Sequence, residues 1–215
     1  LYGVSQRKYQ YSANIHTMLL SYLVPVVISI FTFIVKLKST LTFYPSYCII
    51  PYGRGKSRSA DSDFIINEIN RYSDLGYKEV ILTGIHIGLW GDKNILPLLK
   101  EIETKTSIPR YRLGSLNPHE ITPELLTFLQ NSEKFCPHFH LSLQSACNRT
   151  LKRMNRKYTT AQFKGIVDGL REAFDDVAIT TDIMVGFPDE SDEEFNKTVE
   201  FVRNIKFADA HVFQY

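Results

Sequence analysis

Hydrophobic and polar positions alternate with two periods along most of the chain, and this predicts strands that alternate with helices. Residues 61–75 carry apolar side chains at helical spacing, among them Ile65 and Ile69, and Gly76 follows as a stop signal. The next apolar run, 79–84, is short and ends in glycine, which is typical of a buried strand. The pattern therefore begins as one helix followed by one strand.

The same alternation continues to the end of the chain. A first strand is expected at 35–37, and further strands are expected at 110–115, 138–143, 177–185 and 210–213. Further helices are expected at 94–105, at 122–131 and after Thr159 and Ser191. The last two begin with capping boxes, because Gln162 and Glu194 follow those hydroxyl residues at a spacing of three.

Repeated strand–helix units with short connections predict an α/β fold, in which a parallel sheet is covered by helices. Six strands fit either a doubly wound sheet or a partial (β/α) barrel. No G-x-G-x-x-G motif follows the first strand, which argues against a dinucleotide-binding fold. We expect one core domain at 35–215, truncated at its last strand, after an unassigned apolar extension at 1–34.

Residues 18–35 carry no charge, and a run of this length reaches the threshold for a transmembrane helix. Basic residues precede and follow it, so the positive-inside rule gives no orientation. Pro25 and many β-branched residues also fit one or two buried strands. We expect that the run does not act as an efficient membrane anchor, and a membrane-tethered α/β domain is kept as an alternative.

Composition is that of an ordinary globular protein. The 215 residues are 44% hydrophobic and 22% charged, which is enough to form a core. The net charge of +2 is nearly neutral, so any nucleic-acid binding depends on local patches. Three cysteines form no disulfide framework and favour a reducing compartment.

Candidate chemistry gathers where the predicted strands end, because parallel barrels carry function at the carboxyl ends of their strands. Small, hydroxyl and amide residues there would let a nucleoside approach and form hydrogen bonds. The candidates are Thr83, Gly84, Ser115, Gln144, Ser145, Gly186 and Phe187. The alternative is that these are ordinary turns, which favour the same residue types.

Basic residues offer two further candidate sites. A glycine-flanked loop at 53–59 suits an anionic or phosphate-bearing partner, although a solvated turn would look the same. A second basic cluster comprises Arg149, Lys152, Arg153, Arg156 and Lys157. It fits a solvated helix face, a grip on a ligand carboxylate, or contacts with RNA phosphates.

Cys136, His138 and His140 alternate and would share one face of a strand. That spacing suits a metal, but these are also ordinary residues of a barrel interior, and no fourth ligand is evident.

Five stretches, in order, resemble radical S-adenosylmethionine methylthiotransferases, in the branch that modifies N6-threonylcarbamoyladenosine next to the tRNA anticodon. They are residues 82–91, 112–118, 140–145, 151–159 and 182–188. The resemblance covers about 35–215. It implies a partial (β/α)6 barrel of the radical SAM type, a [4Fe-4S] cluster and S-adenosyl-L-methionine. It also implies that the strand-end residues above, together with Arg156, bind the cofactor.

The cluster motif of that family departs from its usual form here. Its pattern Cys-x3-Cys-x2-Cys falls on Leu41, Pro45 and Cys48, and neither Leu nor Pro can ligate iron. Only Cys48 is a candidate cluster ligand, and no side chain is assigned a catalytic role. We therefore expect an incomplete or inactive copy of the enzyme domain.

The resemblance also implies partners and a compartment. The tRNA anticodon region would be the substrate, an electron donor would serve the cluster, and the protein would be cytoplasmic. The alternative is a non-catalytic remnant that still binds a nucleoside or RNA.

Overall fold

The computed structural model describes residues 32–38, 46–48 and 57–215, and every strand pair in this part of the chain is parallel. Hydrogen bonds join the strands in the orders β1-β2-β3 and β4-β5-β6-β7. The strands are β1 (Thr32–Lys38), β2 (Glu79–Gly84), β3 (Arg110–Leu113), β4 (Ser115–Leu116), β5 (His138–Gln144), β6 (Ala178–Val185) and β7 (Asp209–Gln214).

The two sets of strands meet at Gly114, which separates β3 from β4. The Gly114 N–H donates to the Leu82 carbonyl at 2.8 Å, and a Cβ added at Gly114 would lie 3.0 Å from that oxygen. Tyr111 also bridges in parallel to Phe135, just before β5. The strand expected at 110–115 is therefore present in two pieces. With β3 and β4 counted as one interrupted strand, the described residues contain the six predicted strand positions.

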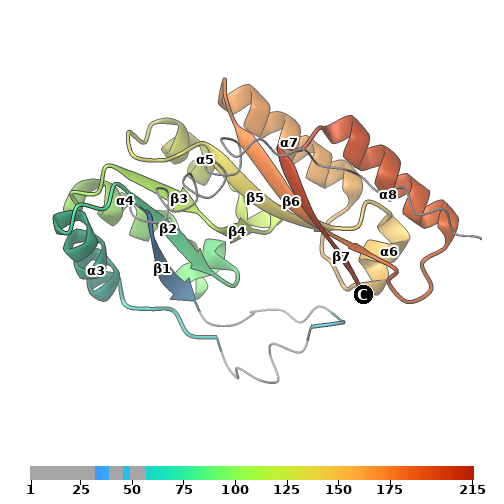
Figure 1. Ribbon diagram of the computed structural model, residues 1–215, viewed down its shortest axis with the longest axis horizontal. Helices are drawn as coiled ribbons and strands as arrows, with labels where there is room; N and C mark the ends of the chain where they lie inside the picture. The colour runs from blue at the N-terminus through green and yellow to red at the C-terminus, as the bar shows by residue number, and fades with distance from the viewer. Residues whose placement is uncertain (1–31, 39–45, 49–56) are drawn as a thin grey trace, which may run out of the picture.

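Helices lie along one side of the strands in Figure 1, and the opposite side, called the open side below, carries none of the helices of the described residues. The helices are α3 (Ser62–Asp74), α4 (Leu96–Lys105), α5 (Pro123–Gln130), α6 (Asn148–Arg153), α7 (Thr160–Ala173) and α8 (Asp192–Ile205). Two short 3-10 turns, η1 (Ile87–Asp92) and η2 (Pro118–Glu120), follow strand ends. The arrangement is the predicted partial barrel.

Local capping explains where most of these helices begin. The Asp61 side chain accepts from the Asp63 and Phe64 N–H groups at the start of α3. The capping boxes predicted at Thr159 and Ser191 are both present. Helix α6 was not predicted, because it has only six residues and no side-chain hydrogen bond at its N-cap.

Strand alternation separates the core from the open face. Phe139, Leu141 and Leu143 of β5 are fully buried in the core that also contains the buried faces of the helices. The intervening residues of β5 point to the open side, which is therefore lined by polar groups. Sequence alternation thus places the candidate site residues on the face without helices.

The first strand begins three residues earlier than predicted, at Thr32 rather than Val35. Part of the proposed extension is therefore strand β1, while residues 18–31 of the apolar run lie outside the described residues. Within the described ranges, no helix is long and apolar enough to cross a membrane.

Candidate functional site

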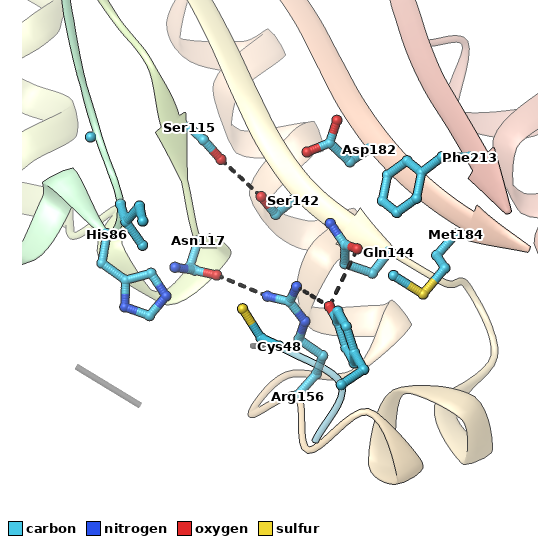
Figure 2. A pocket seen from close by; sticks show the side chains of 13 residues that line it. Cys48, His86, Ser115, Asn117, Ser142, Gln144, Arg156, Asp182, Met184 and Phe213 are labelled. Carbon is cyan, nitrogen blue, oxygen red and sulfur yellow. Dashed lines mark hydrogen bonds between the residues drawn. The ribbon is translucent and has the colours of Figure 1, made fainter. Parts of the chain in front are cut away.

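A cavity of about 360 Å³ opens at the carboxyl ends of the strands. Thirteen residues line it, from the segment 46–48, from the ends of strands β2 and β4 to β7, and from the turn between α6 and α7 (Figure 2). Its volume lies in the range of sites for small molecules.

Arg156 connects three sides of this cavity (Figure 2). Its Nη2 donates to the Tyr47 hydroxyl at 2.6 Å, and its Nη1 donates to Asn117 Oδ1 at 3.3 Å. The Tyr47 hydroxyl in turn donates to Gln144 Oε1 at 3.3 Å. Burial raises the pKa of Tyr47 although Arg156 acts to lower it, so the phenol keeps the proton that it donates.

The short segment that carries Cys48 is attached to the α6–α7 turn. Ser46 donates from its hydroxyl to the Arg153 carbonyl at 2.7 Å and from its N–H to the Met154 carbonyl at 3.3 Å. The Tyr47 ring also packs edge-on against Phe187, with 5.7 Å between centroids. These contacts hold the Cys48 thiol at the cavity wall.

Gln144 reaches the cavity through an unusual backbone conformation. It ends β5 with φ +65°, in the left-handed region, and the β5–β6 register shifts between Leu141 and Gln144. His86, at the end of β2, is also left-handed with φ +53°. Such strain concentrates at binding sites, where the surrounding structure holds it in place.

Asp182 supplies the negative charge of the cavity. His140 Nε2 lies 3.0 Å from Asp182 Oδ2, and His211 Nδ1 lies 3.4 Å from Oδ1. The hydrogen bond from His140 is the main cause that lowers the pKa of Asp182, so the carboxylate is ionised at neutral pH. Beside it, the Ser115 and Ser142 hydroxyls form a hydrogen bond of 2.9 Å.

The cavity thus combines four kinds of chemistry. A carboxylate and an amide can accept from vicinal hydroxyl groups, and the Arg156 guanidinium can bind an anion. Met184 and Phe213 add an apolar wall for a ring system. This combination suits a nucleoside that carries a carboxylate or phosphate.

Five of the residues predicted from the sequence meet at this cavity: Cys48, Gly84, Ser115, Gln144 and Arg156. Thr83 and Phe187 are not part of its wall. Phe187 is buried with Met154 and Met184 and supports the Tyr47 ring from behind.

Two predicted residues point elsewhere. Ser145 is fully buried, accepts from the Cys147 N–H at 3.2 Å and lies 3.4 Å from the Thr198 hydroxyl. The Gly186 N–H donates to the Glu190 carboxylate at 2.7 Å, with Gly186 at φ +73°. Both organise the connections to α6 and α8 rather than the cavity wall.

Sequence reasoning did not single out Asp182 and Ser142. A signal for both was present, because Asp182 alternates with Met184 on β6, and Ser142 alternates with Gln144 on β5. Because side chains two positions apart lie on the same face of a strand, a prediction that Gln144 binds the ligand also predicts Ser142 at the same site.

The basic cluster divides into three parts, of which Arg156 at the cavity is one. Arg153 and Arg149 pair with Glu194 at 2.6 and 3.5 Å, and only 3% of the Glu194 side chain is exposed. The hydrogen bond from Arg153 lowers the pKa of Glu194 to about 2. These two arginines therefore join α6 to α8, whereas Lys152 and Lys157 remain exposed to solvent.

The metal hypothesis for Cys136, His138 and His140 is contradicted in the described part of the chain, which contains no group of three or more residues able to hold a metal ion. Cys136 instead faces Glu79 at 3.8 Å. The glycine-flanked stretch 53–56, Leu41 and Pro45 lie outside the described residues.

Comparison with known sequences identifies a family. The family described as the radical SAM superfamily matches residues 46–202. Threonylcarbamoyladenosine tRNA methylthiotransferase MtaB of Bacillus subtilis is 40% identical over 185 residues, which are 84% of this chain and 41% of that protein. The tRNA-2-methylthio-N(6)-dimethylallyladenosine synthase of Thermodesulfovibrio yellowstonii is 41% identical over 174 residues, or 80% of this chain and 40% of that protein.

Solved structures support the same fold. The radical S-adenosylmethionine methyltransferase TsrM from Kitasatospora setae has a TM-score of 0.72 at 15% identity, covering 88% of this chain and 37% of that chain. The radical SAM enzyme HemN from Escherichia coli has a TM-score of 0.64 at 17% identity, and the match covers 86% of this chain and 43% of that chain. The chain spans about two fifths of the length of the curated relatives that it matches.

Proposed function

Because the chain belongs to the radical SAM superfamily, we propose that it is the S-adenosyl-L-methionine-binding barrel of a tRNA methylthiotransferase. The observation that carries the proposal is the identity of 40% to MtaB of Bacillus subtilis over 84% of this chain. The target would be N6-threonylcarbamoyladenosine beside the tRNA anticodon, with an electron donor as a second partner. We infer a cytoplasmic location, where tRNA is available.

The superfamily implies a [4Fe-4S] cluster and S-adenosyl-L-methionine, and the cavity fits the second of these. Asp182 and Gln144 would accept from the ribose hydroxyl groups, and Arg156 would hold the carboxylate. Met184 and Phe213 would contact the adenine ring. When bound, S-adenosyl-L-methionine supplies an adenosyl group and a methyl group to the reaction.

The residues present do not fit the cluster. Of the three positions that would carry thiolates, 41 and 45 are Leu and Pro, and only position 48 is Cys. Cys136 cannot replace them, because its sulfur faces Glu79 on a different strand, and Cys147 is buried at the start of α6. We derive no reaction step through a cluster in this chain.

The chain's own residues therefore bind and orient the ligand. Arg156 already uses one N–H on each terminal nitrogen for Tyr47 and Asn117, which leaves the remaining N–H groups for an anion. The hydrogen bond from Tyr47 to Gln144 fixes the amide whose conformation is strained. The site is thus organised before a ligand arrives, which lowers the entropy cost of binding.

A second function is favoured by the same observations. Thirteen of the described residues line the cavity, while two of the three cluster positions lack a thiol. A protein of this kind could bind a nucleoside or RNA without catalysis. The two functions differ in whether bound ligand is converted, so binding must be measured before turnover.

The test is calorimetric titration with S-adenosyl-L-homocysteine, which carries the same adenosyl and amino-acid groups. We expect saturable binding that Arg156→Gln weakens about tenfold or more, the effect of losing a charge-assisted pair. Adenosine, which has no carboxylate, should lose much less affinity in the variant than S-adenosyl-L-homocysteine does. Arg203→Gln, at an exposed position of α8, is the matched control. A parent chain that binds no ligand at millimolar concentration would refute the proposal.

Substrate choice needs a separate measurement. Fluorescence anisotropy with an anticodon stem-loop carrying N6-threonylcarbamoyladenosine should give tighter binding than the same stem-loop with unmodified adenosine. Equal binding of the two would remove the assignment to this branch and leave the nucleoside site standing.

A further inference from the structure

A line of polar side chains runs across strands β5 and β6 and ends at the cavity. His138 Nε2 lies 3.4 Å from the Thr180 hydroxyl, and that hydroxyl lies 3.0 Å from His140 Nδ1. His140 Nε2 then lies 3.0 Å from Asp182 Oδ2. Only Asp182 lines the cavity, so the other three act on a ligand through it.

The donors and acceptors along this line fit one direction. The ionised Asp182 can only accept, so His140 Nε2 must carry a proton. In a neutral imidazole, Nδ1 then accepts, and its donor is the Thr180 hydroxyl. The Thr180 oxygen remains free to accept from His138 Nε2.

The far end of the line is consistent with a neutral His138. His138 Nδ1 is buried and has no hydrogen-bond partner within the described residues. A protonated His138 would leave a charged donor unsatisfied there, which is costly. Burial and the nearby Arg112 also lower the pKa of His138.

We propose that His140 is a positioning residue that holds the Asp182 carboxylate toward the hydroxyl groups of the bound nucleoside. Thr180, which also contacts His138, holds the other ring nitrogen of His140 in place. His140 has a side chain only 16% exposed, so little water is available to replace it, whereas His211 on the other oxygen is 69% exposed. The inference rests on the proposed nucleoside role of the cavity.

The binding test compares adenosine with 2′,3′-dideoxyadenosine, which lacks both hydroxyl groups. The parent chain should prefer adenosine by about tenfold or more, because the analogue has no hydroxyl groups to donate to the partly buried Asp182 carboxylate. His140→Leu should reduce this preference to below about threefold, and His140→Gln, whose amide N–H can take the place of Nε2–H, should restore most of it. Dideoxyadenosine should bind all three proteins equally, which a general loss of structure would not allow. Asp182→Asn should behave like His140→Leu, and Asp176→Asn, at an exposed loop position, is the control.

The second readout needs no ligand. Nitrogen-15 NMR of the histidine side chains should show that His140 Nε2 carries a proton at pH 7, and that it still does in Thr180→Val, because Asp182 remains its acceptor. An Nδ1–H tautomer of His140, with no proton on Nε2, overturns the proposal, as does a His140→Leu variant that keeps the full preference for adenosine. Nucleoside binding without any preference overturns this inference alone. Failure of the parent to bind either nucleoside overturns the function and the inference together.

Discussion

Replacing Gly88 by alanine tests how the strand ends are joined around the cavity. An added Cβ at Gly88, in η1, would lie 2.6 Å from Glu120 Cβ and 2.7 Å from Glu120 Oε2. Real Cβ atoms do not approach so closely, so Glu120 must move. Glu120 is only 5% exposed, and its carboxylate binds the Asn117 N–H and side-chain amide, both at 3.0 Å. Asn117 in turn accepts from Arg156.

The expected cost comes from two terms. Forcing an extra methyl group into a packed site costs about 1–3 kcal/mol. Displacing the Glu120 carboxylate also weakens the capping box of η2, which is worth about 1 kcal/mol. The total of about 2–4 kcal/mol corresponds, for a chain of this size, to a fall in Tm of roughly 4–16 °C.

The assay is thermal and urea unfolding followed by circular dichroism. Gly165→Ala is the matched control, because a Cβ there, in α7, meets no atom within 4 Å. That variant should gain about 0.5–1 kcal/mol from helix propensity. The double variant Gly88→Ala with Glu120→Gly should cost no more than Glu120→Gly alone, since Glu120 Cβ and Oε2, the atoms that clash, are both gone. If Gly88→Ala unfolds at the same temperature as the parent, the packing of η1 on Glu120 has been misread.

Three further predictions concern the cluster, the α6–α8 junction and the Cys48 segment. The parent chain should hold no stable [4Fe-4S] cluster after anaerobic reconstitution, and a parent that binds a full cluster contradicts this prediction. The double variant Leu41→Cys with Pro45→Cys should gain iron and visible absorbance, and adding Cys48→Ala should abolish both gains. Because the pKa of Glu194 is lowered to about 2, its pairing stabilises the fold above about pH 4.5 and is lost as the pH falls toward 2. Glu194→Gln should therefore flatten the dependence of urea unfolding on pH in that window, and an unchanged slope argues against the pairing. Tyr47→Phe removes the acceptor of the 2.6 Å hydrogen bond from Arg156 and should lower the free energy of unfolding by about 1–3 kcal/mol. Faster proteolysis near residue 47 is the second readout, and wild-type stability would show that other contacts hold the segment 46–48.

Local sequence patterns determined most of the elements and their order. Capping boxes at Thr159 and Ser191, and strand alternation such as that of β5, act between residues a few positions apart. These signals do not depend on how the sheet closes. They failed where the element was too short, as in α6, or where a strand extended into an apolar run, as in β1.

Which residues line the cavity was decided by the tertiary structure. Its wall contains residues that are far apart in the sequence, such as Tyr47 and Phe213, and they approach one another only because the parallel strands curve together. Gln144 and Ser145 are neighbours and were predicted together, yet the left-handed backbone of Gln144 sends one to the cavity and leaves the other buried beside Thr198. The family resemblance had already assigned Arg156, rather than Arg153, to the cofactor. Packing shows where Arg153 goes instead: it pairs with Glu194 on α8, and a pairing across forty residues has no local signal.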